Sequence, residues 1–327
     1  MGWRDDVDEG KRMKLRLIYP RSPDTVESMY SHSWLIDKYL TFYDNGRGLY
    51  EPGKRSFLIP PYNLMLLAAL VPSDVDVDII DERTQPIPFD ESVDLVGITC
   101  MTSDAPRAYE IAQAFRSRGV PVVLGGIHPT VMTAEALQYA DAVVVGEAEG
   151  VFEQVIEDAK VGRLARTYSS TKFHDMRNLP LARRDLLDAK FYLTKNLVQT
   201  TRGCPHQCSF CSISRTAGSG YRCRPVNEVA DELMSLNGSF VSFVDDNING
   251  NMQYAKKLFE AIQPLNLNWF GDATLLLAEK EPLLRLAAAS GCKILLYGFE
   301  SLSQTTFFDK QKIQQGVPLQ ESNSENA

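Results

Sequence analysis

The segment 201–211 reads Thr-Arg-Gly-Cys-Pro-His-Gln-Cys-Ser-Phe-Cys, with cysteines at positions 204, 208 and 211. Three thiolates can anchor an iron-sulfur cluster and leave one iron without a protein ligand. A small molecule can bind and react at such an iron. The segment therefore predicts a cluster site with one open coordination position.

Two other interpretations of these cysteines stay open at this point. A structural zinc site usually needs four ligands, often from paired CxxC units, and unligated thiols are the second alternative. Clustered cysteines follow a predicted strand here, and an aromatic residue, Phe210, precedes the last of them. This arrangement favours the iron-sulfur cluster, because no such pairing is found among the remaining cysteines, Cys100, Cys223 and Cys292.

Composition excludes several classes of protein. The chain has 327 residues, of which 44% are hydrophobic and 23% are charged, as expected for globular domains. Its formal net charge of −8 comes with no compensating basic tract, so nucleic acid is not expected as a partner. No apolar run reaches the roughly 18 residues of a membrane span, and the charged N-terminus lacks a secretory signal. A cytoplasmic location is expected.

The first region alternates strands with helices. Residues 14–19 read as a strand, and a helix is expected from about Pro60 to Leu70. Asp104 is expected to cap a second helix that stops at Gly119. Strands alternating with helices predict a parallel sheet that binds ligands beyond the carboxyl ends of its strands. Further short apolar strands are expected at 75–81, 94–99, 121–124 and 142–145.

A polar connection of roughly 30 residues, 161–190, is expected as a linker because it exceeds the usual loop length. The strand 197–201 then leads directly into the cysteines. More β/α units follow, and polar groups stand at the carboxyl ends of their strands. These strands are expected at 240–244, 269–274 and 293–299.

The cysteine segment resembles the radical S-adenosylmethionine (SAM) superfamily, whose motif is CxxxCxΦC with an aromatic Φ, here Phe210. The resemblance implies that Cys204, Cys208 and Cys211 hold a [4Fe-4S] cluster. It also implies that the amino and carboxylate groups of SAM chelate the fourth iron. One electron would then cleave SAM to methionine and a 5′-deoxyadenosyl radical, which abstracts hydrogen from a substrate.

By the same resemblance, Phe210 and two other strand ends are expected to contact SAM. The first is Asp245, Asp246 and Asn247, and the second is Gly298, Glu300 and Ser301 in a GxES-like segment. The alternative for the first group is a role in loops and helix caps, which such residues often fill. For the second group the alternative is a solvated turn.

The first region resembles the cobalamin-binding domain that precedes the radical SAM domain in one large subgroup. The resemblance rests on the segments 60–64, 96–100, 124–130 and 145–149 and on their order ahead of the cysteines. Glycines after strands let a flat macrocycle approach the backbone. The residues expected near the corrin are Thr99, Gly125, Gly126 and Gly146.

The DxHxxG motif that supplies a histidine to cobalt is absent after the first strand, so a histidine-off cobalamin is expected. His128 is a candidate replacement ligand, and a structural, hydrogen-bonding histidine is the favoured alternative. A domain that keeps the fold without binding cobalamin also stays open.

The expected fold class is α/β, with an N-terminal Rossmann-like (flavodoxin-like) cobalamin-binding domain and a partial (β/α) radical SAM barrel of about four of the six usual β/α units. The expected bounds are 1–160 for the first domain, 161–190 for the linker, 191–306 for the C-terminally short barrel and 307–327 for a polar, disordered tail.

The expected activity is cobalamin-dependent methyl transfer to a carbon centre of a small-molecule substrate. Radical oxidation or cyclisation is an alternative, as is a cluster- and cobalamin-binding protein without turnover. A low-potential electron donor such as flavodoxin or ferredoxin is the expected partner.

Overall fold

The computed structural model describes residues 12–22, 59–170, 172–206, 208, 210–216 and 220–298. The chain divides into two compact units, unit 1 with Met1–His174 and Asn178–Leu197, and unit 2 with Asp175–Arg177 and Val198–Ala327. The expected SAM contacts Glu300 and Ser301 and the expected tail 307–327 lie outside the described residues.

Unit 1 is built on a six-stranded sheet with the order β2-β1-β3-β4-β5-β6, in which all pairs are parallel. The first five strands follow the 2-1-3-4-5 order of flavodoxin-like folds, as the sequence predicts. The strands are β1 (Met13–Tyr19), β2 (Val75–Asp81), β3 (Leu95–Thr99), β4 (Val122–Gly125), β5 (Ala142–Val145) and β6 (Thr167–Ser169).

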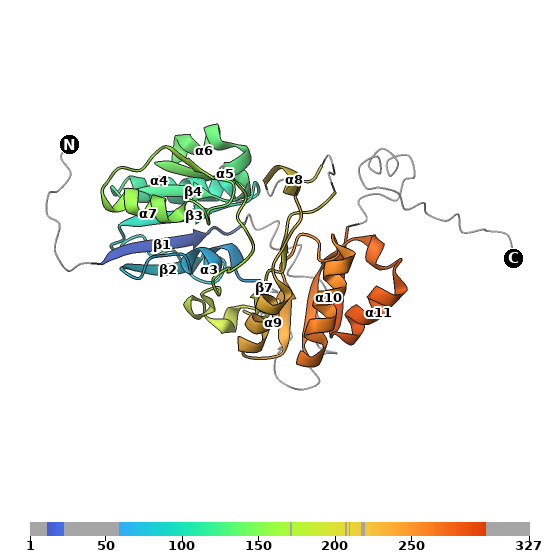
Figure 1. Cartoon of the computed structure of the whole chain (residues 1–327). Helices are drawn as coiled ribbons and strands as arrows, with labels where there is room; N and C mark the ends of the chain where they lie inside the picture. The colour runs from blue at the N-terminus through green and yellow to red at the C-terminus, as the bar shows by residue number, and fades with distance from the viewer. Residues whose placement is uncertain are drawn as a thin grey trace, which may run out of the picture. The chain divides into compact units, whose positions relative to one another are not determined.

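Helices cover both faces of this sheet, so its strands are apolar over most of their length. Helices α4 and α6 lie on one face and α3 and α7 on the other (Figure 1). Within α4, Ala108, Ile111, Ala112 and Phe115 are fully buried, which confirms the expected apolar stripe. The helices are α3 (Tyr62–Ala68), α4 (Ala105–Arg116), α5 (Ile127–Val131), α6 (Thr133–Tyr139) and α7 (Phe152–Lys160).

Asp104 stands at the N-cap position of α4, as expected, but its side chain makes no cap hydrogen bond. Its carboxylate accepts the hydroxyls of Ser22 and Ser103 instead. It therefore ties the loop after β1 to the start of α4.

The range expected as a linker contains structure that the sequence did not reveal. Strand β6 pairs with β5, and the 3-10 helices η1 (Arg184–Leu186) and η2 (Ala189–Phe191) follow. The Tyr192 hydroxyl donates to the fully buried carboxylate of Asp81 across 3.0 Å. Residues 178–197 thus belong to unit 1.

Unit 2 contains a four-stranded sheet with the order β12-β11-β10-β7, so its strands neighbour one another in chain order. Helices α9, α10 and α11 connect the strands and share a core with them, in which Trp269 is the largest fully buried side chain. This is the β/α succession of a partial barrel (Figure 1). The elements are β7 (Leu197–Val198), α9 (Val226–Ser235), β10 (Phe240–Phe243), α10 (Met252–Ile262), β11 (Asn268–Ala273), α11 (Glu281–Ala289) and β12 (Cys292–Tyr297).

The strand expected at 197–201 is split in two. Strand β7 ends at Val198, and β8 (Thr201–Arg202) pairs antiparallel with β9 (Arg222–Cys223) in a separate two-stranded sheet. The break has a physical cause, because the backbone N–H groups of Thr200 and Thr201 donate to the Asp245 side chain.

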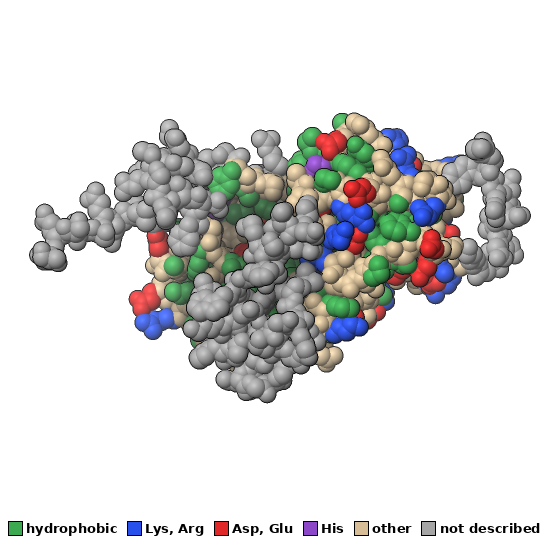
Figure 2. All heavy atoms as spheres, turned by 180° about the vertical axis from the view of Figure 1, so that it is seen from behind, with side chains coloured by type: hydrophobic (Ala, Val, Ile, Leu, Met, Phe, Trp, Pro, Cys, Tyr) green, Lys and Arg blue, Asp and Glu red, His purple; other side chains and the backbone are tan. Residues whose placement is uncertain are grey.

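The face in Figure 2 carries acidic and basic side chains interspersed with apolar ones over the part of the chain that the structure describes. Within the described ranges, no helix has both the length and the apolar character needed to cross a membrane.

Candidate cofactor-binding sites

The three motif cysteines lie on a loop between β8 and β9. Cys208 is buried at 9% exposure, Cys204 and Cys211 are partly exposed, and all three are free of disulfides. The N–H of Cys211 donates to the Cys208 carbonyl across 3.1 Å. The short β8–β9 hairpin, which the sequence analysis missed, brings the two ends of this loop together.

Among the described residues, no three His, Cys, Asp or Glu side chains are grouped closely enough to hold one metal ion. Three cysteine thiolates, each bound to a different iron, are the protein ligands of a four-iron cluster with one open iron. The donor set of the loop fits such a cluster.

The remaining cysteines lie outside the loop. Burial raises the pKa of the Cys100 thiol to about 12, that of Cys223 to about 11 and that of Cys292 to about 12. A thiol must be deprotonated to bind a metal. These cysteines therefore stay neutral thiols.

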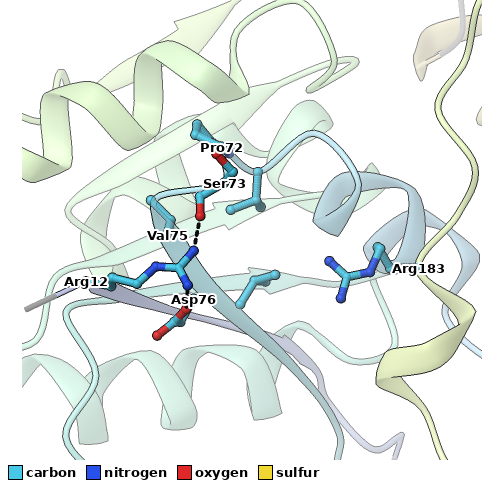
Figure 3. A pocket seen from close by; sticks show the side chains of 8 residues that line it. Arg12, Pro72, Ser73, Val75, Asp76 and Arg183 are labelled. Atoms are coloured by element: carbon cyan, nitrogen blue, oxygen red, sulfur yellow. Dashed lines mark hydrogen bonds and ion pairs between the residues drawn. The ribbon is translucent and has the colours of Figure 1, made fainter.

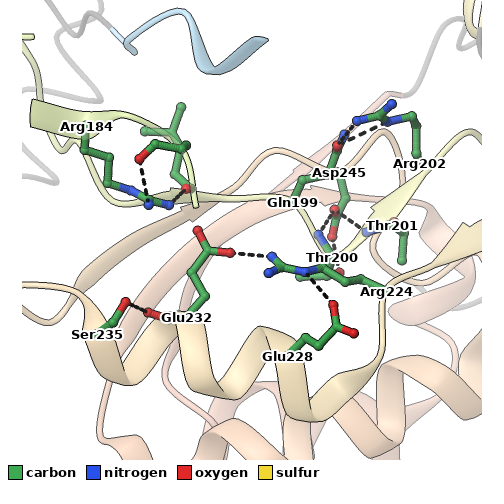
Figure 4. Close-up of polar contacts among 12 residues, drawn as sticks. Arg184, Gln199, Thr200, Thr201, Arg202, Arg224, Glu228, Glu232, Ser235 and Asp245 are labelled. Atoms are coloured by element: carbon green, nitrogen blue, oxygen red, sulfur yellow. Dashed lines mark hydrogen bonds and ion pairs between the residues drawn. The ribbon is translucent and has the colours of Figure 1, made fainter. Parts of the chain in front are cut away.

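Asp245, which follows β10, holds the chain just ahead of the cysteine loop (Figure 4). Its side chain is 1% exposed, and its Oδ1 atom accepts the N–H groups of Thr200 and Thr201 across 2.6 and 2.7 Å. The Thr200 hydroxyl donates to Oδ2. Both carboxylate oxygens are thus engaged within the protein. Desolvation raises the pKa of Asp245 to about 7, although the three hydrogen bonds oppose this shift.

The next two residues hold the loop itself. The Asp246 carboxylate accepts the N–H of Gly203 across 2.8 Å. The Asn247 side-chain amide donates to the sulfur of Cys204 across 3.5 Å. Three consecutive residues, 245–247, therefore hold Thr200, Thr201, Gly203 and Cys204 in place.

Polar groups at the ends of β10 and β11 extend this arrangement. Asn249 and Thr274 exchange two hydrogen bonds of 2.8 Å, which join the two strand ends. The pKa of Asp272 is raised by desolvation and by the negative charge of Asp246. A cationic ligand would relieve this repulsion between carboxylates. No role for Asn249, Asp272 or Thr274 was predicted from the sequence, although Thr274 ends the strand expected at 269–274.

The remaining expected SAM contacts in the described part of the chain are Phe210 and Gly298. Phe210 is 49% exposed on the cysteine loop, and Gly298 is exposed immediately after β12. Arg224 is buried and pairs with the carboxylates of Glu228 and Glu232 on α9 (Figure 4). These contacts support a structural role for Arg224.

In unit 1, the expected cobalamin contacts gather at the carboxyl ends of β3, β4 and β5. The Asn63 amide donates to the Thr99 hydroxyl across 2.8 Å, which joins two of the segments behind the resemblance. Gly126 has a φ of +99°, and a Cβ there would lie 2.7 Å from the Thr99 hydroxyl and 2.9 Å from the Cys100 carbonyl. Only glycine fits this position.

Thr130 connects the two glycine turns that follow β4 and β5. Its hydroxyl donates to the Gly126 carbonyl across 2.7 Å and accepts the Gly146 N–H across 3.0 Å. A Cβ at Gly146 would meet nothing within 4 Å. The strand ends therefore present a backbone edge bare of side chains at Gly146, which fits a flat macrocycle. Thr130 lies in the segment 124–130 behind the resemblance, but no role for it was predicted from the sequence.

His128 lies in α5 and is 5% exposed. Its Nε2 atom is 2.9 Å from the Tyr109 hydroxyl, and its Nδ1 atom is 3.3 Å from that of Thr102. The Tyr109 hydroxyl also donates to Glu135. Both ring nitrogens are thus engaged, which supports the structural role over metal ligation.

A surface pocket of unit 1 lies at the amino ends of β1 and β2, the opposite edge from the glycine turns (Figure 3). Arg12 and Arg183 line it, but Arg12 pairs with Asp76 and Arg183 pairs with Asp185. Both cations are neutralised within the protein, so the pocket shows no feature of a cofactor site.

Residues 53–156 match the family model described as B12 binding domain. A bacteriochlorophyllide d C-12(1)-methyltransferase of Chlorobaculum tepidum is 33% identical over 255 residues, covering 74% of this chain and 56% of the relative. A bacteriochlorophyllide d C-8(2)-methyltransferase of the same organism is 32% identical over 264 residues, covering 74% of this chain and 58% of the relative. The chain thus spans just over half the length of these curated relatives.

A solved structure shares the fold. The radical S-adenosylmethionine methyltransferase TsrM of Kitasatospora setae, with tryptophan substrate and a SAM analogue bound, superposes with a TM-score of 0.67 at 17% identity. The match covers 93% of this chain and 62% of that chain. Both the flavodoxin-like unit and the partial barrel are included in this coverage. Residues 53–156 thus carry the B12-binding domain that this family model describes, and the chain is similar to curated methyltransferases over about three quarters of its length.

Proposed function

We propose that the chain binds the cofactors of a cobalamin-dependent radical SAM methyltransferase that methylates a carbon atom of a small organic substrate. The observation that carries the proposal is the placement of the cysteine loop. The residues after β10 hold it through hydrogen bonds with Thr200, Gly203 and Cys204. The names of the bacteriochlorophyllide methyltransferases and of TsrM support methyl transfer as the reaction.

In this proposal Cys204, Cys208 and Cys211 hold a [4Fe-4S] cluster, and SAM completes it. When bound, the cluster supplies the electron that cleaves SAM. Asp246 and Asp272, whose charges repel each other, are the candidate contacts for the positively charged SAM molecule. Asp245 acts differently, because its buried oxygens are fully engaged in holding Thr200 and Thr201.

The glycine turns after β4 and β5 are the proposed contact surface for cobalamin, with Thr99 beside them. When bound, cobalamin carries the methyl group that is transferred. Gly126 and Gly146 place no side chain on this edge. Thr130 fixes the distance between their turns through its two hydrogen bonds. His128 takes no part in binding cobalt, because both its ring nitrogens face protein hydroxyls.

The experiment needs no knowledge of the substrate. The chain is reconstituted anaerobically with iron, sulfide and hydroxocobalamin, then given SAM and a low-potential reductant. Formation of methylcobalamin, followed by its visible spectrum, and of 5′-deoxyadenosine, followed by chromatography, is the expected result. A protein that retains both cofactors and yields neither product would contradict the proposed function.

A further inference from the structure

We infer that Asn247 is a positioning residue that tunes the reduction potential of the cluster through its hydrogen bond to the Cys204 sulfur. The inference rests on the proposed function, since it assumes that the loop holds a cluster. It goes further because it assigns control of the cluster's reduction potential to a residue in the loop that follows β10.

The side-chain amide of Asn247 has only one orientation that is compatible with its neighbours. Its Oδ1 atom accepts the N–H of Asn249 across 3.2 Å, which leaves the Nδ2 group as the one that faces sulfur at 3.5 Å. The reverse orientation would place two donors against each other. The assignment of Nδ2 as donor to Cys204 therefore follows from the contact with Asn249.

The surroundings of Asn247 also keep its side chain directed at the Cys204 sulfur. The residue is 1% exposed, and its carbonyl accepts the Tyr221 hydroxyl across 2.8 Å. Gly250 allows the Tyr221 ring to lie close, because a Cβ at position 250 would come within 2.5 Å of that ring. The donor is thus held on both its backbone and its side chain.

Reduction changes the charge of the cluster. A cluster gains negative charge when it is reduced, and its sulfur ligands share that charge. A hydrogen bond to a ligand sulfur stabilises the reduced form more than the oxidised form, and hydrogen bonds to sulfur are among the factors that set cluster potentials. Removal of the Asn247 donor is therefore expected to make the potential more negative.

The test is a potentiometric titration of the reconstituted full chain, followed by the EPR signal of the reduced cluster. Asn247→Leu removes the donor while keeping a side chain branched at the same position, and Gln253→Leu is the matched control, since Gln253 is exposed on α10. The expected result is a more negative potential for Asn247→Leu and a wild-type potential for Gln253→Leu. Equal potentials for wild type and Asn247→Leu would overturn the inference.

If Asn247→Leu takes up no iron, a second pair of variants tests whether the Asn247 hydrogen bond affects the reduction potential. Asn247→Asp keeps the acceptor for the Asn249 N–H but loses the donor, and Asn249→Asp adds the same charge without touching sulfur. The inference requires a larger negative shift for Asn247→Asp, and equal shifts would refute it. A wild-type chain without any cluster would instead refute the proposed function.

Discussion

The carboxylate of Asp245 accepts both the backbone N–H and the hydroxyl of Thr200, a residue that lies 45 positions earlier in the chain. This relationship joins the end of β7 to the end of β10 where the cysteine loop begins. It explains why β7 stops at Val198, since the next N–H groups point to a side chain instead of a neighbouring strand. The placement of the loop therefore depends on a buried carboxylate.

Replacement of Asp245 should show which of its properties matters. Asp245→Ala leaves the N–H groups of Thr200 and Thr201 buried without a partner, at about 1–3 kcal/mol each. Asp245→Asn keeps Oδ1 for both N–H groups, and its amide can donate to the Thr200 hydroxyl. We expect a loss of several kcal/mol in the free energy of unfolding for Ala and a much smaller loss for Asn, measured by chemical denaturation. Equal losses would contradict this role.

The stability of the fold should also depend on pH through Asp245. Its pKa is about 7 in the folded protein, against an ordinary value of 3.8. Between these values the folded state binds a proton that the unfolded state lacks, so the contribution of this group to stability falls as pH rises from about 4 to about 7. From about pH 5 to about pH 8, wild type should lose on the order of 1–3 kcal/mol more than Asp245→Asn. Parallel pH profiles of the two proteins in denaturation would rule this out.

Thr130 should control cobalamin binding without touching the cofactor. Thr130→Val removes the hydroxyl that joins the turns at Gly126 and Gly146, whereas Thr130→Ser retains it. Loss of one such bridge is expected to weaken retention of hydroxocobalamin about tenfold for Val, in line with about 1–2 kcal/mol for a partly buried hydrogen-bonded group. Ser should bind as wild type does. The measurement is the corrin absorbance after desalting, and equal retention by Val and wild type would refute the assigned role.

His128 should be replaceable without a change at cobalt. Its ring contacts Tyr109 and Thr102, and its side chain is buried. We expect His128→Gln to lower the free energy of unfolding while the visible spectrum of bound hydroxocobalamin stays that of wild type. A spectral change that reports loss of an axial nitrogen would show that His128 is a ligand after all.

Much of the fold could be predicted from local sequence patterns. The bounds of β2 and β5 agree with the expected strands, and the stripe on α4 is buried as its spacing implies. Such patterns report which side chains face a core. They do not report long-range polar contacts, and so β7 was expected to run through to Thr201.

In the site, too, local patterns could be predicted from the sequence and long-range polar contacts could not. The cysteines could be identified from their spacing, and the glycine turns from their place after strands. The roles of Asp245 and Thr130 could not be predicted, because each depends on partners that only the folded chain brings near. For Asp245, the sequence suggested contact with SAM or a loop role, and its geometry supports the second.

The central claim is that the loop at residues 204–211 holds an iron-sulfur cluster. Its most direct test is the iron and sulfide content of the anaerobically reconstituted chain, compared between wild type, Cys208→Ala and the control Cys292→Ala. The account predicts about four irons per chain with cluster absorption for wild type and Cys292→Ala, and loss of both for Cys208→Ala. Unchanged iron content and absorption in Cys208→Ala would contradict it.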